Sequence, residues 1–291
     1  MSSTIFRNYD QAALDAEYDN RRKVTDSAAW LARYARWSEA ARATMRFDAD
    51  LAYGESAGER LDLFYPDPMP AERLPVNLFI HGGYWKALDK ADHAFVARGL
   101  CAQGAITAVV NYTLMPTAPM DELVAQCRRA LAWLHRNVAR LGGDPGRLHV
   151  CGHSAGGHLT ATTMATDWPR FAPDLPARLV RSACGISGLY DLEPIRLCYL
   201  NQELGLDAET SARQSPVNMI PAKPCPLLLC VGELEGPEYL RQSEDLATAW
   251  SAHGASVRVR VMPGDDHFSI AAALNEPGST LSRAIGESMR G

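Results

Sequence analysis

A serine between two glycines is the first feature of this chain with clear chemical potential. The segment Gly152-His153-Ser154-Ala155-Gly156 has the pattern G-x-S-x-G, and it stands where an apolar stretch gives way to a run of small residues. In that context the pattern predicts a nucleophile elbow, a sharp strand-to-helix turn that exposes a serine hydroxyl above a sheet. The two glycines fit such a turn because it leaves no room for side chains behind it. Ser154 is therefore the candidate nucleophile.

A serine hydroxyl needs a base to take its proton, and a carboxylate must orient that base. After an elbow serine, the acid and then the histidine are expected at later strand ends. His267 lies in a loop after the last predicted strand and is the candidate base. Glu235 lies three residues beyond the glycine that ends the preceding strand and is the candidate acid. Glu233 lies in the same loop, so the sequence leaves the choice between the two glutamates open.

A second glycine-bearing loop follows an earlier strand. The segment His81-Gly82-Gly83-Tyr84-Trp85 comes directly after the apolar residues 75–80. Acyl transfer places negative charge on the carbonyl oxygen of the substrate, and backbone N–H groups that already point at this oxygen stabilise it. One donor is expected from the residue after the nucleophile and another from this earlier loop. The predicted oxyanion-hole residues are Gly82, Gly83, Tyr84 and Ala155.

Aromatic residues near these loops favour an aromatic substrate pocket. We expect Trp85 and Tyr190 to contact the substrate, with Tyr84 and Tyr199 beside them. A metal-dependent reaction has little support, because no His, Asp or Glu group has ligand spacing such as H-E-x-x-H. We therefore predict neither a metal nor another cofactor.

The elements that must position these residues alternate between strands and helices after residue 65. Strands are predicted at residues 75–80, 106–112, 147–151, 179–186, 226–231 and 257–262, and helices at 90–103, 120–141, 156–166 and 237–253, with a further helix at the C-terminus. Such alternation predicts an α/β fold in which a mostly parallel sheet carries helices on both faces. Sites in such sheets lie at the carboxyl ends of strands, where the candidate residues fall.

Two segments interrupt this alternation. Residues 1–46 are predicted to be a helical N-terminal segment, followed at about 44–65 by an antiparallel hairpin. The tryptophans of the N-terminal segment, Trp30 and Trp37, are candidates to pack on the core, to cover the site or to contact a second subunit in a homodimer. Residues 187–224 contain prolines and a Tyr/Leu-rich stretch and are a candidate cap over the site. Without repeats or low-complexity segments, residues 1–291 are predicted to form one domain.

Composition narrows the class of protein. The chain has 291 residues, of which 47% are apolar and 22% charged, as in an ordinary globular protein with a full core. The net charge of −5 and the lack of a basic run argue against nucleic acid as a partner. No apolar stretch approaches the roughly 18 residues needed to span a membrane. Seven cysteines without a C-x-x-C pair, and an N-terminus unlike a signal peptide, predict a cytoplasmic protein. The expected partner is a small-molecule substrate.

Several motifs together resemble the hormone-sensitive-lipase-like branch of the α/β-hydrolases, and more closely its arylformamidase (kynurenine formamidase) group. The most specific is HGGYW at 81–85, with lysines at 86 and 90, in place of the lipase HGGG. The segments that are also similar to this group are GHSAGGHL at 152–159, SGLYDLEP at 187–194, GPEYLRQS at 236–243 and LDAEYDNRRKV at 14–24. The resemblance thus spans nearly the whole chain.

This resemblance implies an α/β-hydrolase fold and hydrolysis of N-formylkynurenine or a related aryl formamide. It also implies Ser154 as nucleophile, His267 as base and oxyanion donors at Gly83 or Tyr84 with Ala155. The chain departs from the group at the acid, which is usually an aspartate before a Ser-Pro-Glu-Phe-like segment. Here Glu235 precedes Gly-Pro-Glu-Tyr.

Two other functions compete with the formamidase-like interpretation. A general carboxylesterase for short acyl groups would use the same residues. A non-catalytic ligand-binding protein on a hydrolase fold would normally lack one member of the triad, whereas this chain has all three. We therefore predict a serine hydrolase that cleaves a carboxylic ester or an aryl amide through an acyl-enzyme.

Overall fold

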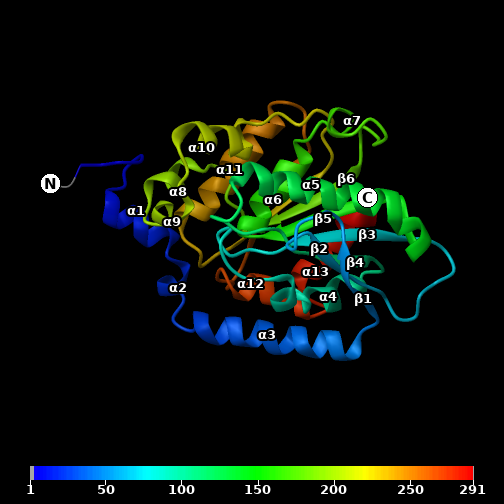
Figure 1. The fold of residues 1–291 in the computed structure, drawn as a ribbon. Coiled ribbons are helices and arrows are strands. Elements are labelled where there is room, and N and C mark those ends of the chain that lie inside the picture. The colour runs from blue at the N-terminus through cyan, green and yellow to red at the C-terminus, as the bar shows by residue number, and fades with distance from the viewer. Residues whose placement is uncertain (1–2, 291) are drawn as a thin grey trace.

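A central eight-stranded sheet organises the computed structural model of the chain, which describes residues 3–290 (Figure 1). The strands are β1 (Phe47–Ala52), β2 (Arg60–Phe64), β3 (Leu74–Ile80), β4 (Ile106–Val110), β5 (Gly143–His153), β6 (Val180–Ile186), β7 (Leu227–Gly232) and β8 (Val257–Met262). They lie in the order β1-β2-β4-β3-β5-β6-β7-β8. β3 to β8 are mutually parallel, and the hairpin of β1 and β2 joins them antiparallel. The predicted mostly parallel α/β sheet is confirmed, and so is the hairpin.

Helices cover both faces of this sheet (Figure 1). One face carries α5 (Met120–Asn137), α6 (Ala155–Met164) and α11 (Pro237–Ser251), and the other carries α3 (Ser27–Thr44), α4 (Val96–Cys101), α12 (Ser269–Ala272) and α13 (Thr280–Arg290). Each face of the sheet has its own hydrophobic core: the first lies under α5, α6 and α11, and the second under α3, α4, α12 and α13. Side chains along a strand alternate between them, so that in β3 Leu78 and Ile80 pack in the first core and Phe79 in the second. This alternation follows from the two-residue period of a strand.

Some predicted helices are divided. The N-terminal helical segment consists of α1 (Gln11–Tyr18), α2 (Asn20–Lys23) and α3, because Asp19 ends α1 and its side chain caps the N-terminus of α2. The helix predicted at 90–103 is a 3-10 turn, η1 (Lys90–His93), which begins at a capping box formed by Asp89 and is followed by α4. The helix predicted at 120–141 ends in the 3-10 turn η2 (Val138–Leu141).

The N-terminal segment is attached to the sheet by a buried ionic cluster. The Asp62 carboxylate on β2 is fully buried and accepts a hydrogen bond from Lys90 Nζ at 2.8 Å. Arg42 on α3 also pairs with Asp62. Trp30 and Trp37 on α3 are partly buried against the second core. The tryptophans thus pack on the core, the first of their three predicted alternatives.

The candidate cap, residues 187–224, is built from short helices joined by loops. It contains α8 (Glu193–Leu197), α9 (Asn201–Leu204), α10 (Ala208–Gln214) and the 3-10 turn η3 (Pro216–Asn218). α8 lies against α1, so the N-terminal segment and this insertion meet at one end of the molecule (Figure 1). The remaining short helices are α7 (Trp168–Phe171) and η4 (Ala273–Asn275).

All seven cysteines carry free thiols, and six of them are buried. Burial raises the pKa of the Cys127 and Cys151 thiols to about 12, so both remain protonated at neutral pH. Within residues 3–290, no helix combines the length and the apolar character that crossing a membrane requires.

Buried histidines make the free energy of unfolding depend on pH. Burial lowers the pKa of His81, His149 and His158 to about 4, so these rings are neutral in the folded protein at pH 6. In the unfolded chain their pKa is about 6.5, so the unfolded state binds more protons as the pH falls. The free energy of unfolding should therefore decrease between about pH 6.5 and pH 4, by at most about 3 kcal/mol for each histidine.

Urea denaturation at several pH values measures this dependence. His149 lies on β5, where its Nδ1 is 2.7 Å from Ser182 Oγ. The substitution His149→Gln should make the free energy of unfolding less dependent on pH, and His253→Gln is the matched control at an exposed histidine. An equal pH dependence in the wild type and in His149→Gln would contradict the account.

Candidate active site

Ser154 occupies a sharp turn between β5 and α6. Its backbone has φ 58° and ψ −120°, an uncommon conformation for a residue with a side chain, and its N–H donates to the Ile186 carbonyl at 2.8 Å. The turn brings the backbone of α6 close to the end of β3. A Cβ on Gly156 would lie only 1.9 Å from the Ile80 carbonyl oxygen. Only glycine fits at that position. The structure thus has the elbow that the G-x-S-x-G pattern predicts.

A continuous line of hydrogen bonds joins Ser154 to two buried side chains. His267 Nε2 lies 3.1 Å from Ser154 Oγ, and His267 Nδ1 lies 2.7 Å from Glu235 Oε2. All three side chains are buried: Ser154 is 3% exposed, His267 5% and Glu235 2%. Since Nδ1 faces a carboxylate, it carries the proton in the neutral ring and leaves Nε2 as the acceptor. This tautomer is the one that can take a proton from the serine hydroxyl.

The two glutamates of the acid loop have different surroundings. Glu235 Oε1 accepts hydrogen bonds from Ser187 Oγ at 2.5 Å and from the Gly232 N–H at 2.6 Å. Glu233 is exposed, and its carboxylate accepts from the Gly264 N–H at 2.9 Å. Of the two candidates left open by the sequence, the structure brings Glu235 to His267.

Ser187 is a contact that the sequence analysis missed. It directly follows β6 at the same edge of the sheet as the acid loop, and its backbone has φ 50°. A polar residue just beyond a buried strand was the available signal.

The loop of residues 81–85, called the HGGYW loop below, passes beside the elbow. A Cβ on Gly82 would lie 3.0 Å from Ser154 Cβ, and Gly83 has φ 108°. Ala155 begins α6, so its N–H is in the first turn of that helix, where N–H groups have no partner within the helix. Of the predicted oxyanion-hole residues, Gly82 and Ala155 therefore lie next to Ser154, and Gly83 and Tyr84 line the same cavity as Ser154.

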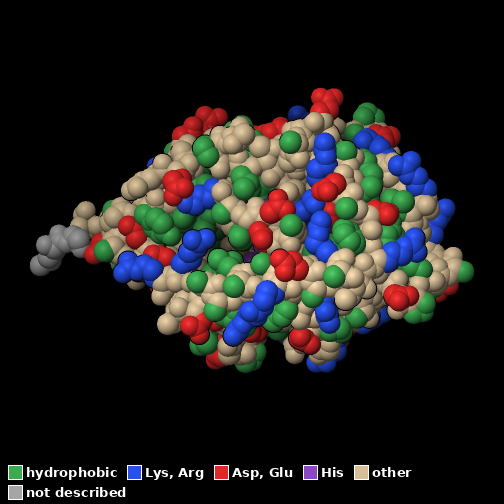
Figure 2. Space-filling view, turned by 60° about the horizontal axis from the view of Figure 1, so that its bottom comes forward, with side chains coloured by type: hydrophobic (Ala, Val, Ile, Leu, Met, Phe, Trp, Pro, Cys, Tyr) green, Lys and Arg blue, Asp and Glu red, His purple; other side chains and the backbone are tan. Residues whose placement is uncertain are grey.

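A cavity of about 470 Å³ opens over Ser154 and His267. It is lined by three groups: residues of the N-terminal segment, of the HGGYW loop and its continuation, and of α9 with its flanks; these include Asp19, Asn20, Arg21, Leu31, Tyr34, Gly83, Tyr84, Lys86, Tyr199, Leu200 and Glu203. Figure 2 shows a hollow on this face with side chains of both charges around it. Within residues 3–290, no group of three or more His, Cys, Asp or Glu side chains is arranged to hold a metal ion.

The predicted substrate contacts of Trp85 and Tyr190 need correction, because both side chains are fully buried and neither lines the cavity. Trp85 Nε1 donates to His158 Nδ1 at 3.1 Å, which ties the HGGYW loop to α6. The Tyr190 ring occupies the space beside two glycines. A Cβ on Gly185 would lie 2.1 Å from the Tyr190 hydroxyl oxygen, and a Cβ on Gly188 would lie 2.3 Å from the ring carbon Cζ. Tyr84 and Tyr199, the other two predicted pocket residues, do line the cavity.

Three rings pack around His267 that sequence reasoning did not place there. The ring centroids of His153, Tyr239 and Phe268 lie 4.7, 4.8 and 5.8 Å from that of His267. Burial, reinforced by the neighbouring His267, lowers the pKa of His153 well below its ordinary value. His153 therefore stays neutral and does not repel the imidazolium that forms when His267 takes a proton.

Comparison with known proteins places this geometry in a family. Residues 61–175 match the family model described as BD-FAE. Kynurenine formamidase of Danio rerio is 32% identical over 253 residues, which cover 85% of this chain and 84% of that protein. Kynurenine formamidase of Salmo salar is 33% identical over 254 residues, with the same coverage. The chain belongs to the kynurenine formamidase family.

Solved structures share the fold of this chain. A putative thioesterase of Silicibacter sp. is 30% identical with a TM-score of 0.81, covering 94% of this chain and 98% of its own. Esterase B of Lactobacillus rhamnosis, at 18% identity and a TM-score of 0.71, shares the fold over 93% of this chain and 95% of its own. This member of the kynurenine formamidase family therefore has the predicted α/β-hydrolase fold. It is a serine hydrolase that cleaves ester or amide bonds of small molecules.

The two glutamates of the acid loop provide a matched test of the site in this kynurenine formamidase family member. Glu235→Gln keeps the size of the side chain but removes the charge that faces His267, so kcat should fall by about 10³- to 10⁴-fold. Glu233→Gln, two residues away, should leave kcat within about twofold of the wild type, as expected for a surface substitution. Steady-state kinetics measure both. Equal losses in the two variants would contradict the assignment of Glu235.

Proposed function

We propose that this enzyme hydrolyses an aryl formamide such as N-formylkynurenine, through a formyl-enzyme on Ser154. The observation that carries the proposal is the buried line of hydrogen bonds from Ser154 through His267 to Glu235. It lies at a cavity in a chain of the kynurenine formamidase family.

In the first half-reaction, Ser154 Oγ attacks the formyl carbon while His267 Nε2 takes the hydroxyl proton. Negative charge moves to the carbonyl oxygen, where the N–H of Ala155 and an N–H of Gly83 or Tyr84 stabilise it. His267 then gives its proton to the amide nitrogen, and the C–N bond breaks to release the arylamine. Glu235 holds the ring and stabilises its charge between these steps.

In the second half-reaction, a water molecule attacks the formyl ester on Ser154. His267 takes the proton of this water and returns it to Ser154 Oγ as the ester bond breaks. Formate is released, and the Ser154 hydroxyl is regenerated. Because both half-reactions pass through an oxyanion at the same place, one set of N–H donors serves both.

Glutamate in place of the aspartate usual in this group suits the surroundings of residue 235. The longer side chain starts from a different backbone offset, and Ser187 Oγ and the Gly232 N–H both bind its second oxygen. Charge-assisted hydrogen bonds of this kind are stronger than neutral ones and fix the carboxylate plane. This support lets Glu235 take the role that the family's aspartate has.

A general short-acyl carboxylesterase is the second candidate function. Esterase LipC of Mycobacterium tuberculosis is 32% identical over 146 residues, which cover 48% of this chain. Esters and amides differ at the leaving group, since an arylamine must be protonated by His267 before it departs. The two candidates therefore differ in how kcat/KM depends on the leaving group.

The compartment and the oligomeric state are also proposals. The free, mostly buried cysteines support a reducing compartment such as the cytoplasm. The homodimer stays a prediction from the sequence, to be measured by light scattering.

The substitution Ser154→Ala tests the nucleophile. Hydrolysis of N-formylkynurenine and of nitrophenyl acetate should both fall by at least about 10³-fold, because the group that forms the acyl-enzyme is gone. Labelling by a fluorophosphonate should disappear, and circular dichroism should show an unchanged fold. Wild-type turnover by Ser154→Ala would overturn the proposal.

A kcat/KM series over N-formylkynurenine, other aryl amides and nitrophenyl esters of increasing acyl length tests the substrate. The formyl compounds should be preferred, and kcat/KM should fall as the acyl chain lengthens. A preference for long acyl esters would instead favour the carboxylesterase.

A further inference from the structure

The HGGYW loop holds an unusual backbone conformation. Tyr84 and Trp85 have φ values of 48° and 58°, in the left-handed region that side chains with a Cβ rarely adopt. Such residues cost free energy and persist only where surrounding contacts hold them. The Trp85 ring is held by His158 on α6. Tyr84 is held by its hydroxyl group.

The Tyr84 hydroxyl is bound by the N-terminal segment. It donates to the Tyr18 carbonyl at 2.7 Å, and it lies 3.0 Å from the Tyr239 hydroxyl. Asn20 Nδ2 donates to the Tyr84 oxygen at 3.1 Å and to the Tyr239 oxygen at 2.6 Å. The Asn20 amide has two hydrogens, one for each phenol oxygen. Asn20 is 5% exposed, so no solvent replaces these bonds freely.

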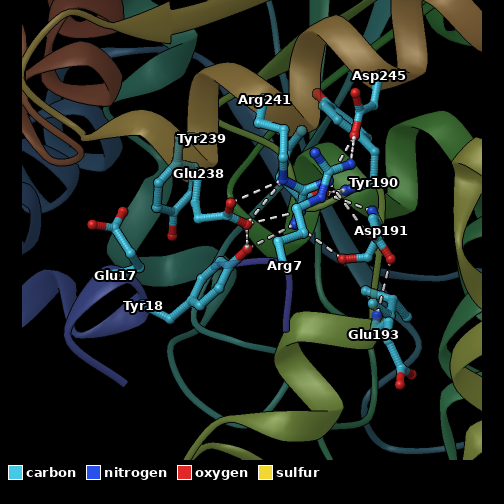
Figure 3. Close-up of polar contacts among 12 residues, drawn as sticks. Arg7, Glu17, Tyr18, Tyr190, Asp191, Glu193, Glu238, Tyr239, Arg241 and Asp245 are labelled. Atoms are coloured by element: carbon cyan, nitrogen blue, oxygen red, sulfur yellow. Dashed lines mark hydrogen bonds and ion pairs between the residues drawn. The ribbon is translucent and has the colours of Figure 1, made fainter. Parts of the chain in front are cut away.

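The N-terminal segment is itself firmly attached at this point. Tyr18 donates to Glu238 Oε2 at 2.8 Å, and Arg241 binds the same buried carboxylate (Figure 3). Arg241 also pairs with Asp245 at 2.7 Å, and Arg7 reaches Asp245 at 3.1 Å (Figure 3). One hydrogen bond, from Tyr18 to Glu238, and one ion pair, from Arg7 to Asp245, thus fasten the residues before Asn20 to α11 and hold Asn20 in place.

The same segment also reaches the acid loop. Lys23 Nζ donates to the Glu235 carbonyl at 3.1 Å, and Asn20 and Lys23 are the two ends of α2. Tyr239, the second partner of Asn20, packs its ring on His267. This short helix therefore contacts both the HGGYW loop and the acid loop, and it reaches His267 only indirectly, through Tyr239 on α11.

We propose that Asn20 is a positioning residue for the HGGYW loop: its amide fixes the Tyr84 hydroxyl and so holds the loop's backbone N–H groups toward the Ser154 site. This inference rests on the proposed function, in which those N–H groups stabilise the oxyanion. The stabilisation exists only in the transition state, so loss of the positioning contact affects kcat rather than substrate binding.

The experiment compares Asn20→Leu, Tyr84→Phe and the double variant with the wild type on N-formylkynurenine. A small displacement of reacting groups costs up to about 100-fold in rate, so each single variant should lose between about tenfold and 100-fold in kcat, with KM within about twofold. Tyr84→Phe also removes the hydrogen bond to the Tyr18 carbonyl, so it should lose at least as much kcat as Asn20→Leu, and the double variant should lose about as much as Tyr84→Phe alone. The pH dependence of kcat/KM should keep its shape.

Gln11→Ala is the matched control. Gln11 ties α1 to the Leu197 carbonyl at 3.0 Å, so its loss weakens the N-terminal attachment away from the HGGYW loop. Its kcat should stay within about twofold of the wild type. Thermal melts followed by circular dichroism establish that each variant folds. If Asn20→Leu does not fold, the smaller and polar substitution Asn20→Ser replaces it, because Tyr84→Phe alone does not separate Asn20 from the Tyr18 carbonyl.

Three outcomes overturn the inference. An unchanged kcat in Asn20→Leu or in Tyr84→Phe means that the loop does not depend on the amide or on the hydroxyl. A raised KM with unchanged kcat means that Asn20 binds substrate instead. A shifted pH profile means that Asn20 acts on His267 through Tyr239. Failure of the proposed function is separate, since it requires that Ser154→Ala remain active in the same assay.

Discussion

The close approach of two backbones at the elbow is the constraint on which the rest of the structure depends. Gly156 at the start of α6 lies against the Ile80 carbonyl at the end of β3, with no space for a Cβ between them. This contact brings the nucleophile turn and the HGGYW loop together. It also explains why the two strands must be neighbours, as β3 and β5 are in the sheet. The HGGYW loop and the serine then come from adjacent strand ends.

Around this contact, each functional group is fixed from behind by a buried partner. Glu235 is held by Ser187 and Gly232, and His267 by Glu235 and three packed rings. Such support keeps the groups close to the reactive geometry before substrate binds, which is the main source of rate in acyl transfer. The cost is a set of uncommon backbone conformations, at Ser154 and in the HGGYW loop, that the surrounding packing must maintain.

The sequence predicted the parts of the site that depend on local pattern. Ser154 and the HGGYW loop stand directly after a strand, and His267 lies in the loop that follows β8. Strand ends of a parallel sheet meet at one edge, so order along the chain was sufficient. Glu235 and Glu233 were inseparable, because which carboxylate turns inward depends on contacts with Ser187 and Gly264 from other loops.

Other features depended on tertiary packing and had no local signal. Trp85 and Tyr190 were expected at the substrate, yet an aromatic residue at a strand end serves equally well as a buried anchor. Asn20 is more than 60 residues from Tyr84 and more than 200 from Tyr239. Nothing in its own neighbourhood points to the site, although the resemblance at residues 14–24 marked the segment.

The central claim is that Ser154 carries the acyl group during turnover. Acid quench of the enzyme within the first turnovers of N-formylkynurenine, followed by peptide mass spectrometry, tests it most directly. We expect a peptide containing Ser154 that is heavier by one formyl group, and we expect this adduct to decay as formate is released. A quenched enzyme without the adduct while the arylamine accumulates in a burst, or a formyl group on another residue, would contradict it.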